Sequence, residues 1–170
     1  MIIALTGTPG TGKTSVAAEL GELTGYEVVD LTKFVKNHGL GAEEDGEYEV
    51  DVEAMVAALE EELDPDRDYI IDGHLSHHYS ADYCVVLRTN PEELRKRLSQ
   101  RSYDKGKINE NVEAETLDSV LIEAVGPQEK ENIIEIDTTD RAAADVAKEV
   151  NTRLESGETG YGSIDWTEYL

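Results

Sequence analysis

A glycine-rich segment near the start of the chain limits the possible folds more than any other feature. Gly7–Thr14 reads GTPGTGKT, and the residues before it, MIIALT, are almost entirely apolar. The pattern GxxxxGK[ST] requires a buried strand that leads through a tight glycine turn into a helix, where backbone amides surround a phosphate group. The complete pattern in this context predicts a P-loop rather than a chance glycine turn.

The residue types of this segment suit a nucleoside triphosphate with its magnesium ion. Gly7, Gly10 and Gly12 allow backbone angles and a close phosphate approach that a side chain would block. Lys13 can reach the β- and γ-phosphates, and the Thr14 hydroxyl can bind Mg²⁺. We therefore expect the chain to use ATP and Mg²⁺.

Apolar runs and helical patterns alternate along the chain. The runs predict strands at Ile2–Thr6, Tyr26–Val29, Tyr69–Asp72, Tyr83–Arg88 and Asn132–Asp137. The patterns predict helices at Lys13–Leu23, Leu31 to about His38, Val52–Leu63, Glu92–Arg101, Asn111–Val125 and Asp140–Leu154. Strands separated by helices form parallel βαβ units. The chain is therefore expected to be an α/β protein of the P-loop NTPase class, with a doubly wound five-stranded parallel sheet flanked by helices.

Three segments fall outside this alternation. Residues 39–49 (GLGAEEDGEYE) are acidic and glycine-punctuated, which predicts a mobile excursion rather than a packed element. Residues 102–108 (SYDKGKI) predict a polar loop. The tail from Glu155 is either a loosely ordered end or a segment that docks on the domain or a partner through Tyr161, Ile164, Trp166 and Tyr169. We favour docking, because a solvated tail rarely needs the sole tryptophan of a chain.

The charge balance is strongly acidic. The chain has 38 acidic and 15 basic residues, a net charge of −23. Its general surface would repel phosphates, so we expect no direct nucleic-acid binding through that surface. The composition resembles that of proteins from salt-loving archaea, in which strong salt screens the self-repulsion. The acidic surface could also contact a basic partner, and the two interpretations are compatible.

Several features indicate a cytoplasmic protein. No signal peptide is recognisable, and no apolar run approaches the length of about 20 residues that a membrane span needs. We therefore expect no membrane association. The single cysteine, Cys84, excludes an intrachain disulfide, which fits a reducing compartment. It lies in the apolar run YCVVL and is expected to be a core residue rather than a nucleophile.

Polar residues near the end of one strand are candidates for the chemistry. A parallel α/β sheet binds its ligand at the carboxyl ends of its strands. Asp72 ends the YIID strand and could bind magnesium, or could simply cap a turn. His74 follows and could orient or deprotonate a water or acceptor near the γ-phosphate. His77 and His78 complete an HxxHH spacing that lacks a second ligand cluster, so we interpret them as loop residues rather than zinc ligands.

Basic residues offer further phosphate contacts. Arg97 and Arg101 lie one helical turn apart, beside the polar loop, and could close over the transferring phosphates. The alternative is a solvated cationic helix face. Lys33 and Lys36, together with Asp30, could bind a second phosphate-bearing substrate or could be ordinary surface residues.

Five motifs together resemble the adenylate kinase superfamily. They read GTPGTGKT, DGEYEVD, IIDGH, VVLRTNPEELRKRLxxRxY and KINENVEAE. The resemblance is greatest to adenylate kinase isoenzyme 6 and its archaeal relatives, and it extends from Met1 to about Leu154. It implies a nucleoside monophosphate (NMP) kinase domain at residues 1–154, with an NMP-binding segment at about 30–50 and a short lid at about 100–110. Residues 155–170 would form a C-terminal tail.

The resemblance also implies site residues. Nucleotide contacts would come from Gly10, Thr11, Gly12, Lys13, Thr14, Ser15 and Arg101. The catalytic set would be Lys13, Asp72, His74, Arg97 and Arg101, with Thr14 and Asp72 at the magnesium ion and Asp30, Lys33 and Lys36 at the monophosphate. The implied reaction is ATP plus AMP, or another NMP, giving two diphosphates.

The same resemblance implies ATPase activity and a role in maturing the small ribosomal subunit through ribosomal protein uS11. Two readings remain open beside the kinase: a ribosome-assembly ATPase with little kinase activity, and a small-metabolite kinase. The sequence also departs from typical adenylate kinases. DGHLS lacks the arginine of DG[FY]PR, and lysines replace the arginine of the NMP segment. Lysine cannot make the planar two-pronged phosphate contact of arginine, so we expect weaker monophosphate binding and some ATP hydrolysis.

Overall fold

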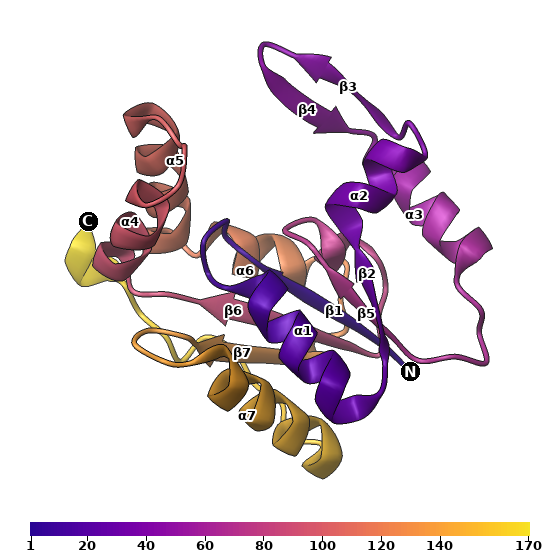
Figure 1. Cartoon of the computed structure of the whole chain (residues 1–170). Helices are drawn as coiled ribbons and strands as arrows, with labels where there is room; N and C mark the ends of the chain where they lie inside the picture. The colour runs from indigo at the N-terminus through magenta and orange to yellow at the C-terminus, as the bar shows by residue number, and fades with distance from the viewer.

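The centre of the molecule is one parallel sheet of five strands. The computed structural model describes residues 1–170. The strands of the sheet are β1 (Ile2–Gly7), β2 (Glu27–Asp30), β5 (Tyr69–Asp72), β6 (Tyr83–Arg88) and β7 (Ile133–Asp137). Their order is β2-β5-β1-β6-β7, and all neighbours are parallel (Figure 1). The predicted α/β fold with a five-stranded parallel sheet is confirmed, and the strand that leads into the P-loop lies at its centre.

Helices cover both faces of the sheet. They are α1 (Lys13–Thr24), α2 (Leu31–Asn37), α3 (Val52–Glu62), α4 (Pro91–Ser99), α5 (Lys105–Thr116), α6 (Ser119–Val125) and α7 (Ala143–Ser156), with short 3-10 turns η1 (Ser76–His78), η2 (Lys130–Asn132) and η3 (Thr167–Tyr169). Side chains alternate between the two faces of a strand. Ile3 and Leu5 of β1 accordingly pack in the core beneath α1 and α7, whereas Ala4 packs in the core beneath α6.

Two smaller cores hold the parts that rise on either side of the carboxyl ends of the strands. Leu31 and Val35 of α2 pack with Met55 and Leu59 of α3. On the other side, α4 and α5 pack together through Leu94, Leu98, Ile108 and Val112. Figure 1 shows these two parts as separate arms above the sheet. Each arm has its own apolar packing, so each can hold side chains over the P-loop from a different direction.

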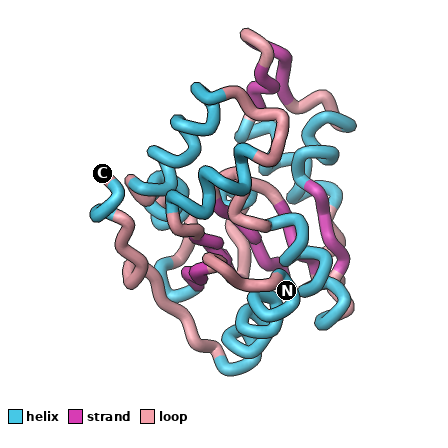
Figure 2. The backbone as a smooth tube through the Cα atoms, turned by 60° about the vertical axis from the view of Figure 1, so that its left-hand side comes forward, coloured by secondary structure: helices cyan, strands magenta, loops and turns pink.

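Residues 39–49 form an ordered hairpin, and the expectation of an unpacked excursion is wrong. β3 (Gly41–Glu44) and β4 (Glu47–Val50) are antiparallel. Asp45 and Gly46 connect them, with φ of 51° and 83°. Two positive φ angles are the geometry of a type I′ turn, for which Asp-Gly is a strong signal. Tyr48 and Val50 anchor the hairpin on the α2–α3 core, and Figure 2 shows it projecting from the main sheet.

The loop expected at residues 102–108 is shorter than predicted. Helix α5 begins at Lys105. The Asp104 carboxylate accepts a hydrogen bond from the backbone N–H of Lys107 at 2.8 Å and caps the helix. The segment interpreted as a polar loop is therefore mostly the first turn of a helix.

Residues 111–125 do not form one helix. The chain breaks between α5 and α6 at Asp118, whose φ is 56°. The Asp118 carboxylate pairs with the buried Arg88 guanidinium, a long-range contact that local periodicity does not report. The last helix also begins later than expected, at Ala143, because Asp140 adopts a left-handed conformation with φ of 54°.

The C-terminal tail docks on the domain, as favoured from the sequence. Gly160 forms a parallel bridge with Ile134 at the outer edge of β7. One carboxylate oxygen of Glu135 accepts hydrogen bonds from the backbone N–H groups of Gly162 and Ser163. The hydroxyl of Tyr169 accepts one from the side chain of Asn90. Ile164, Trp166 and Tyr169 are half-buried, whereas Tyr161 is exposed.

Two further sequence predictions concern membrane-spanning helices and Cys84. None of the helices combines the length and the apolar character needed to cross a membrane. Cys84 is fully buried in the core under α6, as expected for a packing residue. Burial raises the pKa of its thiol to about 12, so the thiol stays protonated at neutral pH.

Candidate functional site

The P-loop is held in a conformation that requires glycine. Gly10 and Gly12 have φ of 95° and 94°, a region that other residues rarely adopt. A side chain at Gly10 would also lie 2.8 Å from carbon atoms of Leu94 and Leu98 on α4. The Thr11 hydroxyl donates to the carbonyl of Thr8 at 2.8 Å and closes the turn. The loop is therefore packed directly against α4.

Lys13 lies across this loop. Its Nζ donates hydrogen bonds to the carbonyl oxygens of Gly7 at 2.8 Å and Thr8 at 3.1 Å. Desolvation lowers the pKa of Lys13 to about 8, and the charge of Arg101 adds to this effect, while Asp72 and Glu115 oppose it. The ammonium group is still mainly charged at pH 7, as anion binding requires.

A polar cleft of about 840 Å³ lies above the carboxyl ends of the central strands. It brings together ten predicted site residues: Gly10, Gly12, Lys13, Thr14, Ser15, Asp30, Lys36, Asp72, His74 and Arg101. They come from the P-loop, the ends of β2 and β5, helix α2 and the segment after α4. A volume of this size is at the upper end for small-molecule sites and suits a large charged ligand.

Asp72 and Thr14 offer oxygen ligands in this cleft. Burial raises the pKa of Asp72, while a hydrogen bond from the Thr14 side chain and the charge of Lys13 lower it, and the charge of Asp30 raises it. Asp30 is close because it pairs with Asp72 in register at the ends of β2 and β5. A carboxylate beside a hydroxyl is a donor set that suits Mg²⁺, which prefers oxygen ligands. The residues present therefore fit this ion.

His74 lines the cleft. A side chain at Gly73 would lie 2.7 Å from Cβ of Leu31, so this glycine lets α2 pack against the turn that presents His74. The residue is exposed to solvent along the cleft, and its pKa is lowered by desolvation against the cleft wall and by the charges of Lys13 and Lys107. The shift favours the neutral imidazole, whose nitrogen lone pair can accept a hydrogen bond from water.

The two arginines have different positions. Arg101 lines the cleft, and its charge acts on Lys13. Arg97 is not among the residues that line the central cleft, so the expected contact with the transferring phosphoryl group stays a prediction. Its guanidinium donates to the Thr138 carbonyl at 3.0 Å and to the Gly10 carbonyl at 3.5 Å, and pairs with Glu93 at 3.2 Å. These bonds tie Arg97 to the back of the P-loop.

A second cavity of about 480 Å³ lies on that side of the P-loop. Its polar lining includes Ser15, Arg97, Arg101, Thr138 and Arg141. Arg101 and Ser15 line both cavities, so the second cavity adjoins the central cleft at these two residues.

The two predicted lysines of α2 also differ. The Lys33 side chain is 80% exposed, lies 3.8 Å from Asp30 and does not line the cleft. Lys36 does line it, with Nζ 5.7 Å from the centre of the Tyr48 ring. Asp30 accepts a hydrogen bond from the backbone N–H of Lys33 and so caps α2. Only Lys36 can reach a ligand in the cleft.

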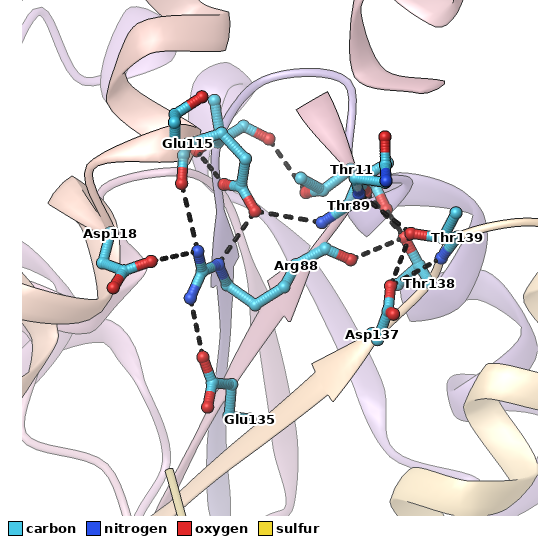
Figure 3. Close-up of polar contacts among 12 residues, drawn as sticks. Thr11, Arg88, Thr89, Glu115, Asp118, Glu135, Asp137, Thr138 and Thr139 are labelled. Carbon is cyan, nitrogen blue, oxygen red and sulfur yellow. Dashed lines mark hydrogen bonds and ion pairs between the residues drawn. The ribbon is translucent and has the colours of Figure 1, made fainter. Parts of the chain in front are cut away.

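A buried ionic network beneath the P-loop escaped the sequence interpretation (Figure 3). Arg88 is 1% exposed and donates to Glu115 at 2.8 Å and to Glu135 at 2.6 Å. The second oxygen of Glu115 accepts a hydrogen bond from the Thr8 hydroxyl at 2.6 Å. The sequence did contain a signal for it, since Arg88 ends an apolar strand and a buried arginine requires carboxylate partners.

A surface ion pair joins the two arms above the sheet. Nζ of Lys107 on α5 lies 2.6 Å from Oε1 of Glu47 on β4. Lys107 is also 5.7 Å from the centre of the Tyr103 ring. A third cavity of about 320 Å³ beside this pair is lined by Lys36, Tyr48, His74, Tyr103 and Lys107 over an apolar base. The hairpin and α5 therefore meet over the α2 side of the site.

Comparisons with known proteins agree with this architecture. A family profile described as AAA domain matches residues 3–118. A Pyrococcus abyssi protein named "Putative adenylate kinase" is 46% identical over 169 residues, covering 99% of this chain and 92% of that protein. A Natronomonas pharaonis protein with the same name is 41% identical over 174 residues, covering all of both chains.

Solved structures show the same fold at low sequence identity. A shikimate kinase from Acinetobacter baumannii in complex with shikimate has a TM-score of 0.63 at 21% identity, covering 94% of this chain and 95% of that one. A deoxyadenosine kinase from M. mycoides with bound dATP has a TM-score of 0.60 at 16% identity, covering 91% of this chain and 100% of that one.

Proposed function

This chain matches the AAA domain profile and belongs to the same family as these archaeal proteins, and on that premise we propose that it is an NMP kinase. The proposed reaction transfers the γ-phosphoryl group of ATP to AMP and gives two ADP. One observation carries the proposal: a single polar cleft holds Lys13 and Arg101 beside Asp72, with Lys36 on the opposite side. Two phosphate-bearing ligands can therefore meet between cationic groups.

The proposed mechanism is alignment and charge neutralisation. The acceptor phosphate is already anionic, so the reaction needs no strong general base. Lys13 leaves the carbonyls of Gly7 and Thr8 for the β- and γ-phosphates, and Arg101 neutralises charge on the transferring group. Arg97 keeps the P-loop backbone in position from behind.

The other groups of the cleft hold the metal and the two nucleotides. The Thr14 hydroxyl and the Asp72 carboxylate would bind Mg²⁺, which neutralises the β- and γ-phosphates when bound. The adenine of ATP would lie in the second cavity, between Arg101 and the segment after β7. The monophosphate would lie near Lys36, with its base in the third cavity, under the hairpin.

An acceptor screen tests this proposal. ADP formation from ATP is measured in molar KCl with AMP, with other nucleoside monophosphates, with a hydroxylated small metabolite, and with no acceptor. We expect AMP to accelerate ADP formation, and Lys13→Ala to lower the rate at least ~100-fold because transition-state charge stabilisation is lost. The exposed Lys148→Ala is the matched control. Near-normal rates in Lys13→Ala would refute the site, and activity only with the metabolite would refute the substrate class.

A second function is favoured by two observations. His74 lies in the cleft as a neutral base near Lys13 and can position water, which would give ATP hydrolysis. The net charge of −23 suits a basic protein partner, such as ribosomal protein uS11 in maturation of the small ribosomal subunit. We expect His74→Ala to impair hydrolysis more than AMP phosphorylation, measured as phosphate and ADP release. Equal losses of the two activities would contradict the role of His74 in positioning water. Phosphate release that uS11 does not change would contradict the proposed partner.

A further inference from the structure

Three side chains from two elements converge next to β1, outside the P-loop. His77 and His78 belong to η1, and Glu123 belongs to α6. One ligand atom from each lies within 4.8 Å of the others. The HxxHH spacing offered no second ligand element, but α6 packs against η1 in the folded chain and supplies the carboxylate. The fold therefore supplies the third candidate metal ligand, which the HxxHH spacing alone lacks.

His77 has one nitrogen with a partner and one without. The ring is fully buried, and its Nδ1 lies 2.8 Å from the Thr6 hydroxyl oxygen. Nε2 is also buried and makes no hydrogen bond. It faces the Glu123 carboxylate, with Oε2 at 3.3 Å. A buried nitrogen without a hydrogen bond is costly, and a cation bound by both this nitrogen and the carboxylate would satisfy the two groups.

We propose that His77, His78 and Glu123 bind a first-row transition-metal dication, with Zn²⁺ as the best chemical match. Bonds of about 2.1 Å to nitrogen and oxygen in a tetrahedral site place the ligand atoms about 3.4 Å apart. The 3.3 Å separation of Nε2 and Oε2 agrees with that spacing. Two imidazoles and one carboxylate leave a fourth position for water, and imidazoles select against Mg²⁺.

The site has an access path and a structural consequence. The Glu123 side chain is 56% exposed and lines the central cleft, so an ion can enter from the solvent side. A bound ion would connect η1 to α6. Since η1 follows directly from the turn that carries Asp72 and His74, the ion would hold that turn against the far side of the cleft. The site does not depend on the proposed kinase reaction.

Metal titration tests the proposal without nucleotide. The protein is stripped with a chelator, dialysed, and titrated with Zn²⁺ by calorimetry and with Co²⁺ by visible absorption. Molar KCl and excess Mg²⁺ are present, so that surface carboxylates do not compete. We expect one ion per chain, and at least ~100-fold weaker binding in both His78→Ala and Glu123→Gln, because each removes a direct ligand.

A matched control separates this site from other histidine–carboxylate pairs. His38 on the surface also pairs with a carboxylate, that of Glu62, but no third ligand is nearby. We expect His38→Ala to bind Zn²⁺ as tightly as the unmodified protein. Circular dichroism checks the fold of each variant, which the partial exposure of His78 and Glu123 favours. Absence of one-to-one binding in the unmodified protein, or unchanged affinity in the His78 and Glu123 variants, would overturn the proposal.

Discussion

At the scale of single residues, Glu115 links three parts of the molecule through one carboxylate. One oxygen accepts from the Arg88 guanidinium and from the backbone N–H of Thr89, and the other accepts from the Thr8 hydroxyl. Glu115 is 2% exposed, so none of these contacts is shared with bulk water. Through the Thr8 contact, helix α5 therefore fixes the start of the P-loop.

Removal of this carboxylate should be costly. Glu115→Ala removes one of the three carboxylates paired with Arg88 and leaves the Thr8 hydroxyl without its buried partner. Leaving buried donors unsatisfied should lower the free energy of unfolding by about 1–3 kcal/mol. Urea denaturation in molar KCl measures the loss. Glu113→Ala, an exposed position on the same helix, is the control and should change stability little. A loss below about 1 kcal/mol in Glu115→Ala would contradict the role of the network.

Cys84 should be unreactive in the folded protein. It is fully buried, and burial raises the pKa of its thiol to about 12, so almost no thiolate forms between about pH 7 and 9. Alkylation by iodoacetamide should therefore be slow and limited by unfolding. A Ser102→Cys variant in a Cys84→Ser background provides an exposed thiol for comparison. Similar alkylation rates for the two thiols would contradict the buried position of Cys84.

At the scale of elements, only a weak contact connects α5 to the hairpin above the cleft. Lys107 and Glu47 are 39% and 61% exposed, so their ion pair contributes at most about 1 kcal/mol. A contact of that strength can hold two arms together and still open for a ligand. We therefore expect this ion pair to affect the distance between the two arms rather than the free energy of unfolding.

Lys107→Gln should loosen this contact without unfolding the protein. We expect the free energy of unfolding to change by less than about 1 kcal/mol, and the distances between α5 and the hairpin to become broader. Pulsed electron paramagnetic resonance between spin labels at Ala42→Cys and Glu110→Cys measures them, because buried Cys84 does not label. Glu44→Gln, which removes an unpaired hairpin carboxylate, is the control. Identical distance distributions in Lys107→Gln and the unmodified protein would contradict the prediction.

The parts of the fold that were predictable are those governed by local sequence. The P-loop, the apolar strands and the capped helices follow from short patterns, and they place Lys13, Asp72 and His74 at one edge of the sheet. The hairpin at residues 41–50 was also predictable from Asp45-Gly46, but the acidic composition obscured it.

Other features depend on partners that are distant in the sequence. Arg88 determines where α5 ends, because it pairs with Asp118 just after that helix. Glu123 becomes a candidate metal ligand only because the fold places it beside histidines of another element. The position of Arg97 behind the P-loop follows from the packing of α4 against Gly10 and Thr138. Helical periodicity alone cannot distinguish that position from one inside the cleft.

At the scale of the whole molecule, the net charge of −23 should make stability depend on salt. The carboxylates repel one another, and added salt shortens the range of that repulsion to about 3 Å at 1 M. We expect the melting temperature to rise from about 0.1 to about 3 M KCl. Differential scanning calorimetry in KCl, with sucrose as a non-ionic control, measures the effect. A flat or falling melting temperature in KCl would contradict it.

The docked tail has a consequence for the order in which the protein matures on the ribosome. Glu135 gives one oxygen to Arg88 and the other to the backbone N–H groups of Gly162 and Ser163. Gly162 and Ser163 are synthesised long after β6 and the P-loop. Domains otherwise tend to fold from the N-terminal side during synthesis. The charge network under the nucleotide-binding loop is thus completed only when residues 162 and 163 have left the exit tunnel, so nucleotide binding should mature well after the P-loop itself has been made.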